Sequence, residues 1–250
     1  MSRRVALVVG ADDVGEAVAR RLVRDGYELV WCDPVEPGSV AGRIAEGGGD
    51  GGGVVTLGAS LDVLDDPDDF RAALGSTLRD AGHDGVDVLV YTLVSVEAFV
   101  PRPLAGLTGA EWQRLAEDPI RHGLTVLQVA HEVLAPRRGR FVLVVPAVAL
   151  EGAAELVPLA TAAETLRALA KSAARRWATD GITVNIVTPD VFAYGAEHLR
   201  GTDVDRGEAV LPGAGTAADV ADAMSLLVAP AAGRLTGTTL VVDGGALMAP

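Results

Sequence analysis

Seven short runs rich in valine, isoleucine and leucine recur along the 250 residues of the chain, and segments of helical period separate most of them. A strand that is buried on both faces is apolar throughout, whereas a half-exposed strand alternates. The runs therefore predict an α/β fold with one doubly wound parallel sheet and helices on both faces. The expected strands are Val5–Val9, Glu28–Trp31, Val54–Leu57, Val86–Tyr91, Phe141–Val145, Thr183–Val187 and Thr239–Val242.

Five segments of helical period lie between these runs. Asp66 before Pro67, and Thr216 before Ala217, are the residue types that cap helix N-termini. The length suits one large domain spanning 1–250, and nothing in the composition requires a second. The expected helices are Glu16–Asp25, Pro67–Ala81, Gly109–Leu134, Leu156–Thr179 and Ala217–Leu227.

Charge and composition disfavour several classes of function. A net charge of −13 disfavours nucleic acid and anionic membranes as partners, because both require clustered lysine and arginine. The longest uncharged apolar run, 141–150, contains Pro146 and is too short to cross a bilayer. A strand begins soon after Met1, which leaves no room for a signal peptide, and Cys32 is the only cysteine. We expect a cytoplasmic protein with no disulfide and no metal site.

The stretch VVGADDVGEAVARRL, residues 8–22, is typical of a strand, a glycine turn and a helix. Glycines such as Gly10 and Gly15 allow a diphosphate to approach backbone amides at a helix N-terminus. Asp12 and Asp13, however, place two carboxylates where a diphosphate would lie, and they can cap the helix themselves. The turn therefore predicts weak phosphate binding or none.

Five blocks, in order and spacing, resemble the short-chain dehydrogenase/reductase family, in particular its 3-oxoacyl-[acyl-carrier-protein] reductases. The first is the glycine turn. LDVLDDPDDF resembles the family's strand ending in Asp-Val, and GVDVLVYTLV resembles its central strand. DGITVNIVTPD and LTGTTLVVDGG resemble its last two strands. The resemblance covers nearly the whole chain and implies a Rossmann-type sheet.

The resemblance also implies where a nicotinamide cofactor would be bound. The positions are Gly10 and Gly15 in the turn, Asp33 at the ribose, and Asp62 and Val63 at the adenine. Asp33 would repel a 2′-phosphate, so we do not expect NADP(H) as a ligand; the alternative role of Asp33 is that of a polar strand end before a turn. The turn also lacks one glycine of the family pattern Thr-Gly-x-x-x-Gly-x-Gly. The expectation is weak NAD(H) binding or none.

Family members reduce carbonyls with a proton relay of tyrosine, lysine, serine and asparagine. Aligned on the family, this chain has Leu159 at the tyrosine, Ala163 at the lysine, Pro146 at the serine and Pro119 at the asparagine. None of these side chains moves a proton. No tyrosine is followed by a lysine four residues later, and the only lysine, Lys171, lies two helical turns beyond Ala163. No catalytic residue is therefore predicted at these positions.

Replacement groups for a new chemistry lie close to these positions in the sequence. Tyr91 is the most relevant, because the carboxyl end of a central strand adjoins the ligand crevice of such a sheet. His122 is expected on a helix surface or at an interface, and Asp190–Gly213 is expected to form a mobile flap. The other candidates are Thr92, Asp118, Glu151, Glu155, Glu164, Tyr194 and His198, each of which also has a purely structural interpretation.

Three functions remain open. The first is a catalytically degenerate, non-catalytic subunit, structural or regulatory, which pairs through two apolar helix stripes. It would form a homodimer, a homotetramer or a hetero-oligomer with an active family member. The second is a repurposed non-redox enzyme, such as a cyclase, dehydratase or isomerase. The third is an NAD(H)-dependent oxidoreductase that uses unconventional residues such as Tyr91.

Overall fold

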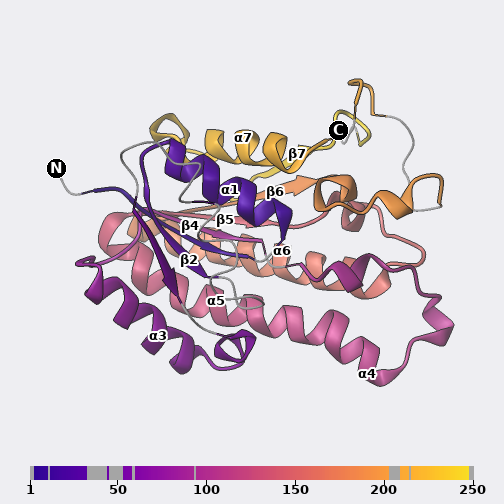
Figure 1. Ribbon diagram of the computed structural model, residues 1–250, viewed down its shortest axis with the longest axis horizontal. Helices are drawn as coiled ribbons and strands as arrows, with labels where there is room; N and C mark the ends of the chain where they lie inside the picture. Colours follow the sequence, from indigo (N-terminus) through magenta and orange to yellow (C-terminus); the bar gives the residue numbers. More distant parts are fainter. Residues whose placement is uncertain are drawn as a thin grey trace.

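Seven parallel strands form one sheet in the order β3-β2-β1-β4-β5-β6-β7 (Figure 1). The computed structural model describes residues 3–10, 12–32, 44, 53–57, 60–92, 94–202, 209–213 and 215–247. The strands are β1 Val5–Val9, β2 Glu28–Cys32, β3 Val54–Leu57, β4 Val88–Tyr91, β5 Arg140–Val144, β6 Thr183–Pro189 and β7 Thr239–Val242. The structure confirms all seven predicted strands, with ends shifted by two residues or fewer.

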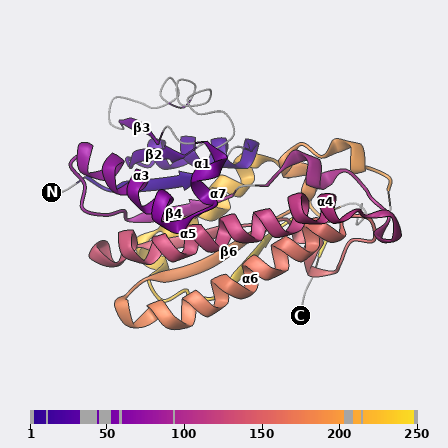
Figure 2. The ribbon, with the colours of Figure 1, turned by 90° about the horizontal axis from the view of Figure 1, so that it is seen from below.

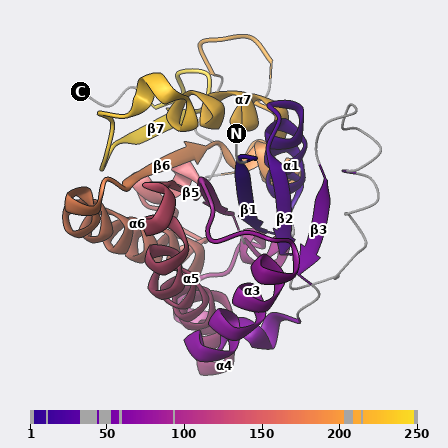
Figure 3. The ribbon, with the colours of Figure 1, turned by 90° about the vertical axis from the view of Figure 1, so that its left-hand side faces the viewer.

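Helices cover both faces of the sheet, as the apolar strands predict. Figure 3 shows α1 and α7 on one face and α3, α5 and α6 on the other, and Figure 2 shows α5 and α6 side by side. The helices are α1 Asp13–Arg24, α3 Pro67–Asp80, α4 Gly109–Trp112, α5 Asp118–Leu134, α6 Val157–Trp177 and α7 Ala217–Val228. The doubly wound α/β fold is confirmed.

Each face of the sheet has its own buried core, because alternate residues of a strand point to opposite faces. In β1, Ala6 and Val8 belong to the core beneath α1 and α7, whereas Leu7 and Val9 belong to the core beneath α3, α5 and α6. All five residues of this strand are buried. A strand of this kind needs apolar residues at every position, which explains the continuous runs in the sequence.

The two predicted helix caps are present. The Asp66 side chain accepts a hydrogen bond from the Asp68 amide (2.7 Å) at the start of α3. Thr216 accepts one from the Asp219 amide (3.3 Å), and the Asp219 side chain in turn accepts one from the Thr216 amide (2.8 Å). These reciprocal bonds form a capping box that begins α7 at the predicted residue.

The segment predicted as one helix, Gly109–Leu134, is instead α4, a π-helical turn at Gln113–Glu117 and α5. Pro119 lies in the first turn of α5. Proline lacks an amide hydrogen and its ring crowds the preceding turn, so the wide π turn directly before it relieves both conflicts. Among the described residues, no helix is long and apolar enough to cross a membrane.

Candidate functional site

The strand order places a crevice at the carboxyl ends of β1 and β4. From β1 the chain continues to β2 and β3 on one side, and from β4 it continues to β5, β6 and β7 on the other side. Ligands of open α/β sheets bind at such a switch point. Two regions meet here. We call the described part of the glycine turn, residues 10 and 12–15, together with Thr92 and Val94, the turn half. We call the small cavity on the other side of β4, around Tyr91, the cavity half.

The turn half is organised by the Asp12 side chain, which is the N-cap of α1. Its Oδ1 atom accepts hydrogen bonds from the Gly15 amide (2.7 Å) and the Thr92 hydroxyl (3.0 Å). Its Oδ2 atom accepts one from the Val94 amide (3.3 Å). The carboxylate therefore binds the start of α1 to the loop after β4. The predicted capping role is confirmed for Asp12; the neighbouring Asp13 side chain is exposed.

Opposing influences act on the pKa of the Asp12 carboxyl. Burial raises the pKa of this carboxyl to about 7, although its three hydrogen bonds favour the carboxylate and oppose the rise. The negative charge of Asp13 adds to the rise. The Asp12 side chain therefore changes charge near neutral pH.

Gly10 and Gly15 are required by this packing. A Cβ atom on Gly10 would lie 2.6 Å from the Thr92 Oγ1 atom, and one on Gly15 would lie 3.0 Å from the same atom. The space that two glycines leave open is thus filled by Thr92, which donates to Asp12. A diphosphate needs free amides and no competing anion. With Asp12 ionised and bonded to the Gly15 amide, the residues of the turn do not fit a dinucleotide diphosphate.

The structure describes two of the three other residues expected to bind a cofactor. Asp33 lies outside the described residues. Asp62 and Val63 belong to a 3-10 turn, Leu61–Leu64, that follows β3; Asp62 is exposed and Val63 half-buried. His122 was expected on a helix surface or at an interface, and the structure contradicts the surface position. Its ring is buried, and its Nε2 atom lies 3.1 Å from the Asp65 Oδ1 atom, which joins α5 to the end of this turn.

The cavity half brings together the four positions that align with the family's proton relay. Pro119, Pro146, Leu159 and Ala163 all line one cavity of about 30 Å³, the space of roughly one water molecule. The other lining residues are Tyr91, Val94, Ser95, Ala98, Leu115, Val144, Val145, Ala162 and Leu166. Among these described residues only Tyr91 and Ser95 carry a polar side chain, so the cavity is almost entirely apolar.

Tyr91 ends β4 and is only 2% exposed. Its hydroxyl is buried and has no hydrogen-bond partner among the described residues. Burial first, and the nearby Asp12 charge second, raise the pKa of the Tyr91 phenol well above its ordinary value. A phenol with a raised pKa is a weak acid near neutral pH, and almost none of it is present as the phenolate that could act as a base.

The remaining candidate groups either bind other protein groups or have exposed side chains. The Thr92 hydroxyl is bonded to Asp12, and the Asp118 carboxylate to Arg121 (2.8 Å). The His198 Nε2 atom lies 3.0 Å from the Phe99 carbonyl oxygen. The side chains of Glu151, Glu155, Glu164 and Lys171 are exposed. None of these residues lines the described cavity.

The expected flap, Asp190–Gly213, is more regular than its sequence suggests over residues 190–202. It contains two short 3-10 helices, Val191–Tyr194 and Glu197–Leu199. Tyr194 and Leu199 are buried, and the Tyr194 ring packs against Phe99 with 5.4 Å between ring centroids. Apolar residues three to five positions apart anchor this part of the segment to the core, a spacing that its glycines and polar residues obscure.

Two further residues, one on α6 and one on α5, were not singled out from the sequence. Arg167 of α6 is 3% exposed and donates to the Thr188 hydroxyl (3.0 Å) and the Glu164 carboxylate (2.9 Å). Gly123 of α5 has no room for a side chain, because a Cβ atom would overlap Leu166 and lie 3.2 Å from the Tyr91 Cε1 atom. An arginine within an apolar helix stripe and a glycine within a helix are the signals that could have identified them.

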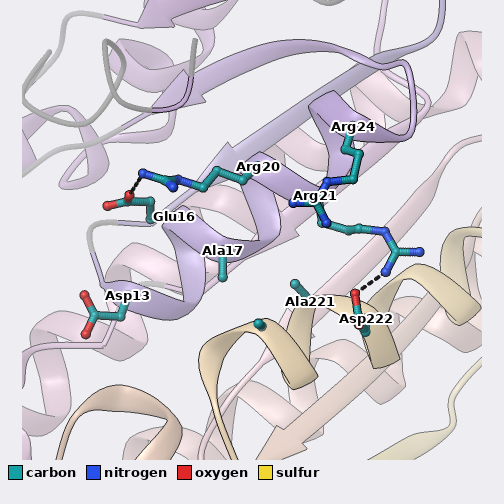
Figure 4. Close-up of a pocket in the computed structure, with 9 residues that line it drawn as sticks. Asp13, Glu16, Ala17, Arg20, Arg21, Arg24, Ala221 and Asp222 are labelled. Carbon is teal, nitrogen blue, oxygen red and sulfur yellow. Dashed lines mark hydrogen bonds and ion pairs between the residues drawn. The ribbon is translucent and has the colours of Figure 1, made fainter. Parts of the chain in front are cut away.

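Among the described residues, two clefts lie outside the crevice. The first, about 400 Å³, runs between α1 and α7 and is lined by Asp13, Glu16, Ala17, Arg20, Arg21, Arg24, Ala218, Ala221 and Asp222. Figure 4 shows ion pairs along it between Arg20 and Glu16 and between Arg21 and Asp222. Its three acids and three arginines balance, so the cleft has no net charge with which to select a charged ligand.

The second cleft, about 380 Å³, lies along α5 and α6 and is mainly apolar. Its lining residues are Leu124, Leu127, Gln128, His131, Leu169, Ala173, Arg176 and Trp177. Leu124 is 40% exposed there, although it belongs to one of the two apolar stripes found in the sequence.

Comparison with known proteins identifies the family. A family model described as enoyl-(acyl carrier protein) reductase matches residues 10–246. The 3-oxoacyl-[acyl-carrier-protein] reductase FabG of Escherichia coli is 29% identical over 98% of each chain. The (2S)-[(R)-hydroxy(phenyl)methyl]succinyl-CoA dehydrogenase subunit BbsC of Thauera aromatica is 29% identical over 97% of this chain and 94% of its own.

Solved structures agree with the fold. An NADH-dependent reductase, A1-R′, complexed with NAD has a TM-score of 0.79 at 20% identity, over 99% of this chain and 98% of its own. A Serratia marcescens short-chain dehydrogenase/reductase mutant has a TM-score of 0.80 at 22% identity, over 97% of each chain. The family match spans nearly the whole chain, including the glycine turn and the six strands β2 to β7, and it begins directly after β1. The chain belongs to the short-chain dehydrogenase/reductase family.

Proposed function

We propose that this chain is a catalytically degenerate member of its family, a structural or regulatory subunit that does not transfer hydride to a carbonyl. The observation that carries the proposal is the cavity of about 30 Å³, in which proline, proline, leucine and alanine stand at the four relay positions. Hydride addition to a carbonyl produces an alkoxide that must receive a proton. A positioned acid or base contributes typically 10²–10⁴-fold to such a step, and these four side chains supply none.

The relatives' names favour the opposite conclusion, since several are reductases. The strongest form of that alternative is an NAD(H)-dependent oxidoreductase in which Tyr91 donates the proton. Its support is that Tyr91 lines the cavity. Against it, burial raises the pKa of this phenol, which makes it a weaker general acid than an ordinary tyrosine. A repurposed non-redox enzyme has less support, because the described cavity has room for about one water molecule.

The test is a reduction assay with a 3-oxoacyl thioester and NADH or NADPH, with the FabG reductase of E. coli as the positive control. We expect no oxidation of either nucleotide by this chain at pH 6 or pH 8. Sustained turnover by the wild-type chain would contradict the proposal. Its loss in Tyr91→Phe would assign the proton to Tyr91, and its survival in Tyr91→Phe and Tyr194→Phe would mean that an unassigned group supplies it.

A subunit role also requires a partner, and we propose that the α5–α6 cleft binds one. The partner is a second copy of this chain or an active family member, giving a dimer or tetramer. Support comes from the apolar lining of the cleft and from the exposure of Leu124 within it. The relative BbsC is named a dehydrogenase subunit, which supports a place in an assembly for a chain of this kind.

Sedimentation of the purified chain, alone and mixed with an active family member, tests this surface. We expect a dimer or a larger assembly, and we expect Leu124→Asp to dissociate it. The matched control is Leu226→Asp on α7, where a leucine is 66% exposed outside the cleft. That variant should remain assembled. A wild-type chain that sediments as a monomer under both conditions would contradict the proposal.

A further inference from the structure

We infer that the Asp12 carboxyl controls access of a dinucleotide to the turn half: the ionised form excludes the diphosphate, and the protonated form admits it. The inference rests on the assignment of the turn half to the dinucleotide crevice. It does not depend on the loss of the proton relay in the cavity half.

The geometry supplies the exclusion. The Asp12 carboxylate accepts hydrogen bonds from the Gly15 amide, the Thr92 hydroxyl and the Val94 amide, at 2.7, 3.0 and 3.3 Å. A backbone amide at the start of a helix following a glycine turn is the donor that a diphosphate would use. Asp12 therefore provides an intramolecular anion at the position of the ligand's own charge. Its side chain must move or lose its charge before a diphosphate can bind.

The burial of Asp12 and the groups around it give the exclusion its pH dependence. The groups that face this carboxyl are Asp13 from α1, Tyr91 from β4 and Tyr194 from the helix Val191–Tyr194. Asp13 is acidic, the two phenols are neutral at physiological pH, and no cation among the described residues opposes them. Burial is the main cause that raises the pKa of Asp12 to about 7, and the charge of Asp13 adds to it, so a modest change of pH removes the charge of Asp12.

Two buried hydroxyls strengthen the assignment of a ligand to this crevice. The Tyr91 and Tyr194 phenols are 2% and 6% exposed, and neither hydroxyl has a hydrogen-bond partner among the described residues. Asp12 raises the pKa of both, which places them within the field of its charge. Buried hydroxyls without partners are rare in proteins, and a bound polar ligand is one way to satisfy them.

Linkage fixes the size of the effect. If only protonated Asp12 admits the dinucleotide, the apparent dissociation constant is constant well below pH 7 and rises tenfold for each pH unit well above it. Between pH 6 and pH 8 the affinity should fall about tenfold. Binding at pH 8 should also take up close to one proton per ligand.

Calorimetric titration of the full chain with NAD⁺ at pH 6, 7 and 8 tests the inference. NAD⁺ is preferred to NADH because it is stable in mild acid. We expect Asp12→Asn, which retains an oxygen for the Gly15 amide but has no charge, to bind NAD⁺ with the same affinity at all three values. Asp13→Asn is the matched control, because it removes the adjacent exposed acid and should preserve most of the tenfold change.

Three results would overturn the inference. The first is equal wild-type affinity at pH 6 and pH 8. The second is an equally steep pH dependence in Asp12→Asn. The third is no binding by Asp12→Asn at any pH, provided that its circular dichroism and thermal transition show a folded chain. None of these results bears on the proposed loss of hydride transfer, which the reduction assay tests separately.

Discussion

The turn half and the cavity half of the crevice lie on opposite sides of β4, yet they depart from the family's chemistry in different ways. In the turn half, polar groups remain, but they are bonded to one another through Asp12. In the cavity half, the four positions expected to be polar are apolar or proline, and one phenol is left without a partner. One proton can change the first region, whereas the second would need several substitutions to regain its chemistry.

The largest expected effect on stability comes from filling the space at Gly123, beside the cavity half. Gly123→Ala would force its Cβ atom against Leu166 and Tyr91, at the contact between α5 and α6. Overpacking of this kind costs about 1–3 kcal/mol of unfolding free energy. Urea denaturation measures the loss. Gly109→Ala is the control, because a Cβ atom there meets nothing within 4 Å; an equal loss in both variants would contradict the tight contact described here.

Two adjacent residues contrast the halves more finely. Tyr91→Phe removes a buried hydroxyl that has no partner, so we expect stability to rise by about 1 kcal/mol. Thr92→Val removes a buried hydroxyl that donates to Asp12, so we expect stability to fall by about 1 kcal/mol. Thermal or urea unfolding of both variants gives the two signs. Changes of the same sign would mean that the two halves do not differ in the way the structure indicates.

Another effect concerns how stability depends on pH. Because the folded-state pKa of Asp12, about 7, exceeds its ordinary value of 3.8, the folded chain binds more protons than the unfolded chain between these values. This group therefore costs stability as pH rises from 4 to 7. Asp12→Asn does not titrate and keeps a good N-cap residue. The melting temperature of Asp12→Asn minus that of wild type should therefore be larger at pH 8 than at pH 5. A difference that is the same at both pH values would contradict the raised pKa of Asp12.

The sequence was sufficient to predict the sheet and most of the helices, because both depend on apolar periodicity and on local caps such as Asp66 and Thr216. The convergence of Pro119, Pro146, Leu159 and Ala163 needed the family alignment as well as the fold. Their distances along the chain carry no information about the size of the cavity that they line.

The hydrogen bonds that define the turn half were not predictable in the same way. Asp12 was expected to cap α1, but its bonds to Thr92 and Val94 join residues 80 or more positions apart. The burial of His122 likewise depends on Asp65, which reaches it from another turn. A single sequence gives no measure of such long-range polar pairs, because their energy depends on burial and orientation that only the folded chain fixes.

The most direct test of the account is a search for hydride transfer under the conditions that favour it most. NADH with deuterium at both C4 positions would be mixed with a 3-oxoacyl thioester and excess protein at pH 6, where Asp12 is mostly protonated. Mass spectrometry would then measure deuterium in the hydroxyacyl product. We predict no deuterated product, even where calorimetry shows dinucleotide binding. Product carrying deuterium, formed at a rate comparable with that of the FabG control, would contradict the claim that the cavity half has lost its chemistry.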